Sequence, residues 1–429
     1  MRGRNRLITL VVALLAIGVV TGASASGRGT SSRAATPSFQ LRIGAIMPLT
    51  GDLGTFGPSI NASTQLAVDT INQTLAKLGL SNSISVDLVD TQDDQSATQP
   101  AIEAATKEVK VDNVDAIIGT MSSTSTIAIA QAVTIPNDIV VISPVASAPQ
   151  ITDLKDNNTV WRMVPSDDFQ GRALATAAAT AFGPHATINV GARNDDYGNA
   201  LQAIFVKTWK AQGGKVGQVV SWDPNGTTFD TEAQKLASGN PDGWVIIDYP
   251  ATFAKVGAAL VRTGTWSPSK TLMTAEMSVP AALKQVGQQA TVGLRGAAPA
   301  SLSPSLPQVA AFAKLFKSKE SKFPVTGYEG TSFDAVMLAF LAALEGHSAS
   351  PNAIKANLRS VSGPPGVKVT YLQLARAIKL ILAGKQIDYE GVFGPVDFDS
   401  NGDIGSALYR IWKYDGKTVT TLKTFTYST

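Results

Sequence analysis

The chain has 429 residues, of which 44% are hydrophobic and 7% aromatic, so it can bury large cores and form two or three domains. Its 36 basic and 33 acidic residues nearly balance, which argues against nucleic acid or an anionic membrane as the main partner. Cysteine is absent and histidine occurs twice, which excludes disulfides and thiolate metal sites, so we expect no cofactor and no metal.

The N-terminus has the pattern of an export signal. Arg2, Arg4 and Arg6 precede an apolar run from residue 7 to 20, and Ala23-Ser24-Ala25 form an A-x-A cleavage site. The run is shorter than the roughly 18 to 20 residues that a membrane span needs, although an uncleaved anchor stays the alternative. We expect residues 1–25 to be a signal peptide and the polar residues 26–38 a flexible leader. With no cysteine for a lipid anchor, the mature protein is expected to be exported, periplasmic or extracytoplasmic, and soluble.

From residue 41 onwards, short β-branched runs alternate with helical periods, which is typical of parallel sheets covered by crossover helices. After Pro58, for example, Ala67, Ile71, Leu75 and Leu78 recur at helical spacing. The strand candidates are residues 41–47, 85–89, 116–118, 139–142, 187–190, 216–220, 244–247, 271–274 and 294–297.

These units exceed what one sheet of ordinary width holds, and a break near residues 161–165 divides them into two sets of similar size. We therefore predict an α/β fold of two doubly wound parallel-sheet lobes. Residues 331–345 and 371–382 are strongly helical, and residues 391–425 are typical of strands with turns at 400–402 and 415–416. Such a return from helices to strands indicates that the chain crosses the hinge several times. Because ligands bind beyond the carboxyl ends of parallel strands, the site is expected in the cleft between the lobes.

Three loops of the first set carry groups that can face this cleft. Residues 48–57 present Phe56, although the same residue can serve as a hydrophobic staple. Residues 119–126 form a hydroxyl cluster around Ser122 and Ser123, which can cradle a carboxylate or simply cap a helix. In residues 142–147, Val145 and Ser147 follow an apolar strand, and Ser147 can donate to the same anion.

The second set contributes Tyr197, Tyr249 and Glu276, each of which follows a strand candidate. A carboxylate that faces a closed cleft is costly unless a cation meets it, and the ammonium of a ligand would do so. The alternative is that Glu276 is a solvated loop residue.

Several ordered motifs resemble those of the type I periplasmic-binding proteins that serve branched-chain amino-acid ABC transporters, and the likeness covers nearly all of residues 39–410. The motifs are Ile43-Gly44-Ala45-Ile46-Met47-Pro48-Leu49-Thr50-Gly51, Ala116-Ile117-Ile118-Gly119 with the serine cluster, Ile142-Ser143-Pro144, Arg162-Met163-Val164-Pro165-Ser166-Asp167 with Gln170-Gly171, Asp195-Asp196-Tyr197-Gly198, and Gly394-Pro395-Val396-Asp397-Phe398-Asp399 with Asn401-Gly402.

The resemblance implies a role for each candidate. The ligand carboxylate would lie on Ser123 and Ser147 with help from the backbone of Val145, and the ligand ammonium would meet Glu276. Contacts from the second lobe and the wall of the side-chain pocket are implied for Asp167, Tyr197, Tyr249 and Phe56. The implied lobes are residues 39–165 with 294–390, and residues 166–293 with 391–429. One departure is Thr120-Met121, which replaces a proline-containing start of the serine loop and predicts a side-chain pocket of different shape.

The sequence therefore predicts a solute-binding protein of an ABC importer, with an amino acid as its ligand, a membrane permease as its partner, and a monomeric state. The alternative is a ligand sensor of the same fold that binds an amide, urea or another small polar solute. No P-loop, G-x-S-x-G motif or metal-ligand set appears, so an enzyme is not expected. Asp397, Asp399, Asn401 and Asp403 have calcium-loop spacing, but Leu408 stands where a glutamate is needed, and we interpret the segment as a β-turn.

Overall fold

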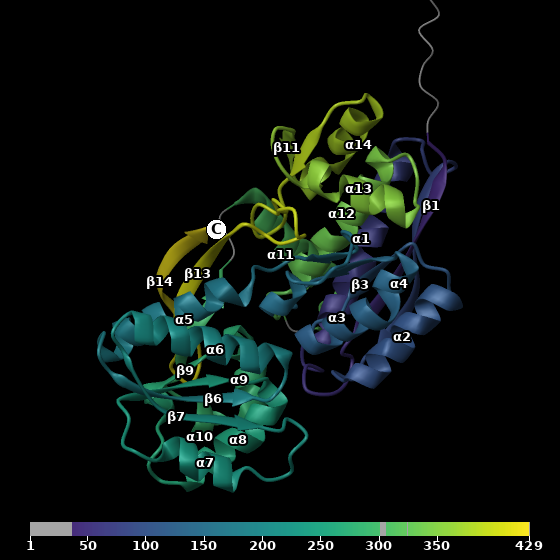
Figure 1. Cartoon of the computed structure of the whole chain (residues 1–429). Coiled ribbons are helices and arrows are strands. Elements are labelled where there is room, and N and C mark those ends of the chain that lie inside the picture. The colour runs from purple at the N-terminus through teal and green to yellow at the C-terminus, as the bar shows by residue number, and fades with distance from the viewer. Residues whose placement is uncertain (1–36, 301–305, 324, 429) are drawn as a thin grey trace, which may run out of the picture. The chain divides into compact units, whose positions relative to one another are not determined.

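A computed structural model describes residues 37–300, 306–323 and 325–428 (Figure 1). The predicted signal peptide and nearly all of the predicted leader lie outside the described residues. The compact unit that contains the described residues runs from Thr36 to Thr429. Within the described part of the chain, we find no helix with the length and apolar character needed to cross a membrane.

The first sheet has five parallel strands in the order β2-β1-β3-β4-β5. They are β1 (Phe39–Met47), β2 (Ile84–Asp93), β3 (Ala116–Gly119), β4 (Val140–Ser143) and β5 (Val160–Arg162). The crossover segments are α1 (Gly57–Lys77), α2 (Thr98–Lys110), α3 (Ser123–Ile129), the π-helical turn Ala130–Thr134, α4 (Ile135–Asn137) and the 3-10 turn Pro149–Ile151.

Both faces of this sheet are buried. Ile43 and Ile142 belong to one apolar core, and Val141 belongs to a second core with residues of α2 and the π-helical turn. In Figure 1, α2, α3 and α4 lie on one side of the sheet. Strands covered on both faces are continuous apolar runs, which explains why the β-branched segments were recognisable in the sequence.

The second sheet has seven strands in the order β14-β13-β10-β9-β8-β6-β7. They are β6 (Thr187–Arg193), β7 (Lys215–Trp222), β8 (Gly243–Ile247), β9 (Thr271–Met273), β10 (Arg295–Pro299), β13 (Ser406–Tyr414) and β14 (Val419–Ser428). The first five of these pair in parallel, and β13 joins β10 antiparallel as part of a hairpin with β14. The helices are α5 (Asp167–Phe182), α6 (Asp196–Ala211), α7 (Asp230–Ala237), α8 (Pro250–Arg262), α9 (Pro280–Val286) and α10 (Gln288–Thr291), with 3-10 turns at Pro268–Lys270 and Ala275–Ser278.

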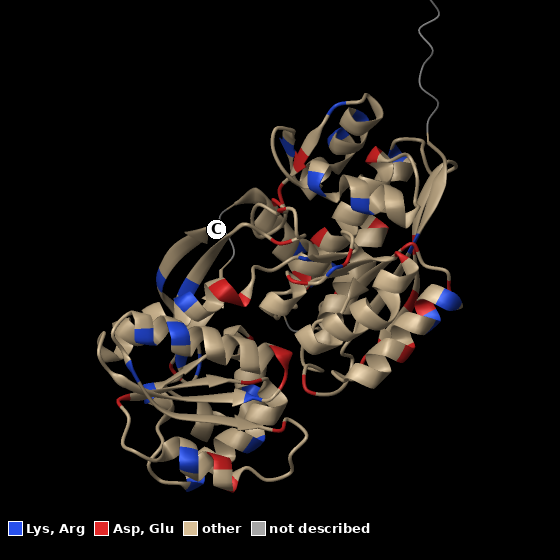
Figure 2. Cartoon of the chain, in the orientation of Figure 1, with Lys and Arg blue, Asp and Glu red and all other residues tan. Residues whose placement is uncertain are grey.

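The segment between β10 and β13 is mainly helical. It comprises α11 (Pro307–Lys319), α12 (Glu329–Glu345), α13 (Pro351–Ser362), β11 (Val367–Val369), the 3-10 turn Tyr371–Gln373, α14 (Leu374–Leu382) and β12 (Ile387–Tyr389). Helix α12 is buried at every residue from Ser332 to Leu344, so it is a core helix. It lies against α1, where Ser63 Oγ donates to the carbonyl of Glu329 at 2.7 Å. Figure 2 shows basic and acidic residues interspersed over the helices, in keeping with the near-neutral balance.

These elements confirm the predicted α/β class with two sheets built mainly from parallel strands, and every predicted strand is present. The break predicted near residues 161–165 contains a strand of its own, β5, which pairs with β4 through residues 160–162. The segment interpreted as a β-turn is one, since the N–H of Gly402 donates to the carbonyl of Asp399 at 3.4 Å, and Asp399 Oδ1 also accepts from the N–H groups of Asn401 (2.7 Å) and Asp403 (3.1 Å).

Two pairings bear on the lobe boundaries expected at residues 294 and 391. Strand β10 pairs with β9 and β13, so it belongs to the second sheet. Residues 398 and 403 contact strand β5 of the first sheet, because the Phe398 ring lies 5.0 Å from the Trp161 ring and Asp403 pairs with Arg162 at 2.6 Å. We therefore propose that the chain crosses between the lobes after Pro299 and again just before β13.

Candidate ligand-binding site

A small cavity of about 20 Å³ lies among the ends of strands from both sheets. Its lining comes from the segments after β4, β5 and β9, from the end of β10, from the residue before α12 and from β13. The lining residues are Val145, Ser147, Val164, Pro165, Asp167, Gln170, Ala275, Glu276, Pro299, Tyr328 and Tyr409. This space holds about one water molecule, so an amino acid can enter only if the surrounding segments move apart.

Hydroxyl groups organise the side of the cavity that follows β4. Ser123 Oγ accepts hydrogen bonds from the backbone N–H groups of Ser147 (3.2 Å) and Ala148 (3.1 Å). Ser122 precedes it as the N-cap of α3 and accepts from the N–H of Ser125. Ser123 therefore fixes the loop that carries Ser147, and its own O–H remains able to donate.

Two acids line the same cavity and are joined by amide and phenol groups. Asp167 accepts from Ser147 Oγ (3.0 Å) through Oδ2 and from Gln170 Nε2 (3.2 Å) through Oδ1. Gln170 Nε2 also lies 3.3 Å from the phenol oxygen of Tyr197, which donates to Glu276 Oε2 at 3.1 Å. The side chains of Asp167 and Glu276 thus belong to one continuous network.

Burial controls the ionisation of both acids. Asp167 is 1% exposed and Glu276 is 6% exposed. Burial raises the pKa of Asp167 to about 8. The hydrogen bond from Ser147 lowers this pKa, and the negative charge of Glu276 raises it further. Burial likewise raises the pKa of Glu276, although hydrogen bonds from Thr274 and Tyr197 partly offset this. Neither acid takes part in any ion pair formed between described residues.

Aromatic residues pack in a layer next to the residues that line the cavity. The rings of Tyr197 and Tyr249 stack with centroids 5.3 Å apart, and the guanidinium carbon of Arg193 lies 3.8 Å from the centroid of Tyr249. On the first-sheet side, Phe56 is fully buried and meets Tyr328 edge-on at 5.8 Å. Tyr328 is thereby held against the cavity that it lines.

Four of the predicted site residues line the cavity, namely Val145, Ser147, Asp167 and Glu276. The other five do not line it, and their contact with a ligand stays a prediction. Phe56, Ser123 and Tyr197 each contact a lining residue. Tyr249 stacks on Tyr197, and Ser122 precedes Ser123 as the N-cap of α3. The prediction missed Tyr328, Tyr409 and Pro299, which no local pattern distinguishes from core residues. Gln170 was part of a recognised motif but was not singled out.

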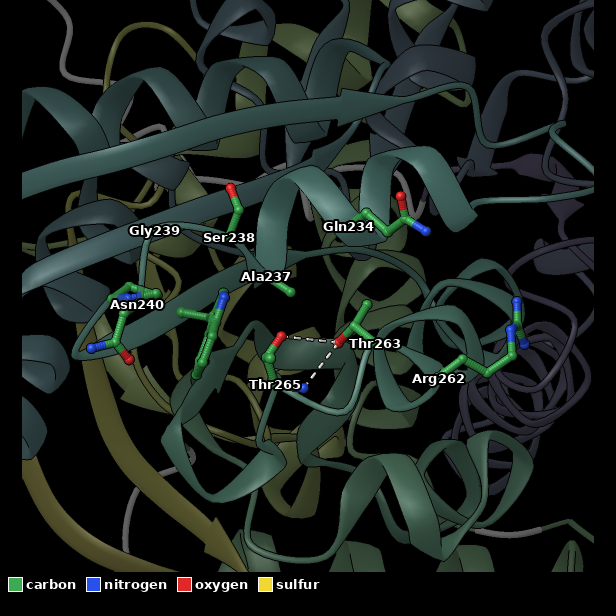
Figure 3. A pocket seen from close by; sticks show the side chains of 10 residues that line it. Gln234, Ala237, Ser238, Gly239, Asn240, Arg262, Thr263 and Thr265 are labelled. Carbon is green, nitrogen blue, oxygen red and sulfur yellow. Dashed lines mark hydrogen bonds between the residues drawn. The ribbon is translucent and has the colours of Figure 1, made fainter.

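A larger pocket of about 470 Å³ opens elsewhere on the second sheet (Figure 3). It lies between the C-terminal ends of α7 and α8 and the start of β8, and it is lined by Gln234, Ala237, Ser238, Gly239, Asn240, Pro241, Trp244, Arg262, Thr263 and Thr265. This is the amino end of β8, opposite to the strand ends at which ligands of parallel sheets bind. Its one charged side chain, Arg262, pairs with Asp230 at 2.6 Å. We therefore place the candidate site at the small cavity.

Among the residues that the structure describes, no group of three or more His, Asp or Glu side chains is arranged to hold an ion.

Two sheets whose strand ends meet at a polar cavity form a site of the kind at which parallel α/β sheets bind small ligands. The model of the periplasmic binding protein family matches residues 40–417, and the chain belongs to this family.

Three relatives match parts of the sequence. An uncharacterised protein of Methanocaldococcus jannaschii is 26% identical over 54% of this chain and 56% of its own length. The Leu/Ile/Val-binding protein BraC3 of Rhizobium johnstonii is 29% identical over 40% of this chain and 45% of its own length. The chemotactic signal transduction substrate-binding protein BasB of Halobacterium salinarum is 36% identical over 20% of each. The chain thus spans about half, or less, of these relatives.

Solved structures match over nearly the whole described chain. The leucine-binding protein LivK of Thermotoga maritima has a TM-score of 0.72 at 22% identity and covers 90% of this chain and 98% of its own. LivJ of Streptococcus pneumoniae, solved with isoleucine, has a TM-score of 0.70 at 18% identity and covers 91% and 100%. A solute-binding protein of R. palustris, solved with benzoate, has a TM-score of 0.69 at 18% identity and covers 90% and 96%. These likenesses establish the type I periplasmic-binding fold.

Proposed function

We propose that this protein is the extracytoplasmic solute-binding component of an ABC importer and that its ligand is an amino acid. The single observation that carries the proposal is the pair of buried acids, Asp167 and Glu276, which line one cavity and form no ion pair with a described residue. A buried carboxylate without a cation is unfavourable, and an ammonium group brought by the ligand relieves this cost for both acids at once.

The ligand carboxylate is assigned to the loops that follow β3 and β4. Ser147 lines the cavity, and the Ser123 hydroxyl, which accepts from two backbone amides, keeps its own proton for donation. The backbone N–H of Val145 is the third donor in this proposal. A ligand that lacks either the amine or the carboxylate leaves buried groups unmatched, which costs about 1 to 3 kcal/mol or more.

Binding is proposed to proceed by hinge closure. A cavity of about 20 Å³ does not admit an amino acid, so the lobes must open before the ligand enters. Residues from both sheets then meet the ligand only in a closed state, and this differential contact shifts the equilibrium towards closure. The closed form is the one expected to dock on the permease.

Two observations keep the alternatives testable. The relative BasB carries a chemotactic role in its name, which favours a sensory component of the same fold as the second candidate. One structural neighbour was solved with benzoate, a carboxylate without an amine. The two ligand classes differ in charge, so Asp167 and Glu276 distinguish between them.

The test is a thermal-shift panel on purified residues 26–429 with amino acids, amides, urea and aromatic carboxylates. We expect stabilisation by at least one amino acid. A response to urea or to a simple acid, with none to any amino acid, would overturn the proposal.

The matched variants are Glu276→Gln and, as a control outside the site, Glu345→Gln. The first is expected to weaken amino-acid binding tenfold or more, and the second to leave it unchanged. Equal affinity in the Glu276→Gln variant would remove the ammonium contact from the proposal.

A further inference from the structure

A second group of contacts joins the two sheets outside the cavity. Asp52, in the loop between β1 and α1, accepts two hydrogen bonds through Oδ2, from Arg193 Nη2 at 3.1 Å and from Thr252 Oγ1 at 2.8 Å. Arg193 ends β6 and Thr252 lies in α8, so both donors come from the second sheet and its helices. None of these three residues lines the cavity.

The loop that presents Asp52 is fixed from its own side. Gly51 has a φ of 80°, and a Cβ at this position would lie 2.1 Å from the carbonyl oxygen of Gln95, so only glycine permits this close approach. Thr50 Oγ1 donates to Asp93 at 2.6 Å, and the N–H of Leu53 donates to Ser96 Oγ at 3.0 Å. The backbone on both sides of Asp52 is therefore held by the first lobe, and the partners of its carboxylate are Arg193 and Thr252 of the second lobe.

Arg193 is equally fixed on the other side, with a side chain that is 4% exposed. Its Nε donates to Asp195 at 2.5 Å, its Nη1 lies 3.5 Å from Asp248, and its guanidinium group covers the ring of Tyr249. These contacts leave Nη2 directed at Asp52. Because the Arg193 side chain and the backbone at Asp52 are each fixed within their own lobe, the ordering cost of this contact is limited to the short Asp52 side chain.

Two further hydrogen bonds extend the same line of contact. Thr55 Oγ1 donates to Gln285 Oε1 at 2.5 Å, and the N–H of Asp196 donates to Thr124 Oγ1 at 3.2 Å. Each joins a segment of the first sheet to a segment of the second, and none of the four residues lines the cavity.

We propose that Asp52, through Arg193 and Thr252, is a positioning residue that holds the two lobes closed whatever ligand lies between them. Its contacts form in the closed arrangement, and it makes none with the cavity. If only the closed state retains ligand, the observed dissociation constant scales inversely with the closed fraction. Asp52 then sets the affinity for every ligand by one common factor and leaves the order of preference among ligands unchanged. The expected effect on ligand affinity rests on the proposed function, whereas the expected effect on the closed fraction of the ligand-free protein does not.

Asp52 is a cleaner probe of closure than Arg193. The Arg193 side chain covers Tyr249, which stacks on Tyr197, which in turn donates to Glu276. A change at Arg193 therefore disturbs the ligand site as well as the contact between lobes. Replacement of Asp52 by Asn keeps the shape of the side chain and removes its charge.

The experiment measures the separation of the lobes without ligand. The natural chain has no cysteine, so Lys77→Cys on α1 and Lys235→Cys on α7, both exposed, accept two spin labels on the full exported protein. We expect Asp52→Asn and Thr252→Val each to shift the distance distribution towards longer separations, with less than additive effects in the double variant. The control is Asp230→Asn, which breaks an exposed ion pair with Arg262 inside one lobe. Identical distributions for the natural chain and Asp52→Asn would overturn the proposal.

Calorimetry on the same variants tests the common factor. For every compound that binds, Asp52→Asn is expected to raise the dissociation constant about three- to thirtyfold, with the ratios between compounds preserved. Ratios that change from compound to compound would mean that Asp52 contacts ligand, and would overturn the assignment. If no amino acid binds at all, the proposed function fails, while the distance measurement still decides the role of Asp52.

Discussion

Asp167 makes the stability of the ligand-free protein depend on pH in a defined direction. Burial raises its pKa from an ordinary 3.8 to about 8, so between these values the folded protein holds a proton that the unfolded chain releases. The free energy of unfolding that this group contributes is fully present below about pH 4 and is lost as the pH rises towards 8. Each bound proton changes the free energy of unfolding by about 1.4 kcal/mol per pH unit.

The perturbation is Asp167→Asn, and the assay is urea unfolding of ligand-free protein at pH 5, 6, 7 and 8. Asp94 and Asp334, whose pKa values burial raises to about 7, give the natural chain further slope of the same sign. Between pH 5 and 8, the free energy of unfolding of the variant is expected to fall less steeply with pH than that of the natural chain, by an amount equivalent to up to about one bound proton. Asp168→Asn, an exposed neighbour, is the control and should keep the natural slope. If the free energy of unfolding depends on pH equally in Asp167→Asn and in the natural chain, Asp167 does not hold the extra proton of the folded state.

Ligand binding should have the opposite dependence on pH. An ammonium group favours the ionised forms of Asp167 and Glu276, so binding expels protons and affinity increases from pH 5 to 8. Titrations in buffers of different ionisation enthalpy count these protons directly. Affinity that instead falls over this range indicates a carboxylate ligand without an amine, for which protonated acids are the better partners.

Three further changes test other parts of the structure. Glu108 is fully buried without an ion pair to a described residue, and burial raises its pKa. Glu108→Gln should therefore stabilise the protein by about 1 to 3 kcal/mol at pH 8 and by little at pH 4, as measured by urea unfolding. Ser123→Ala removes the acceptor of the Ser147 amide and a donor proposed for the ligand carboxylate, so calorimetry should give at least tenfold weaker binding, and unchanged affinity would exclude that role. The Tyr427 ring lies 5.1 Å from the Arg172 guanidinium and 6.0 Å from the Tyr409 ring, so Tyr427→Ala should lower the melting temperature whereas Tyr427→Phe keeps most of the stability.

Much of the fold could be predicted because buried parallel strands leave continuous apolar runs in the sequence. Strand β5 escaped this pattern because it has only three residues and its identity depends on pairing with β4. The sheet to which β10 belongs could not be predicted for a related reason. Whether β10 extends one sheet or begins a return to the other is decided by its neighbours β9 and β13, which no local pattern reveals.

The candidate site was predictable to a similar extent. Glu276 was recognisable because a carboxylate directly after a strand end requires a partner, and Ser147 because its loop follows an apolar strand. Tyr328 and Tyr409 come from the last third of the chain and are brought to the cavity by tertiary structure alone. Phe56 follows the expected strand end, but it packs behind Tyr328 and does not face the cavity.

In the proposed function, one closed site recognises both charges of an amino acid. Calorimetry can compare leucine with the same molecule lacking its amine and with the same molecule lacking its carboxylate. We expect heat of binding from the amino acid and affinity at least tenfold weaker when either group is absent. Equal or tighter binding of the carboxylate without an amine would contradict this expectation.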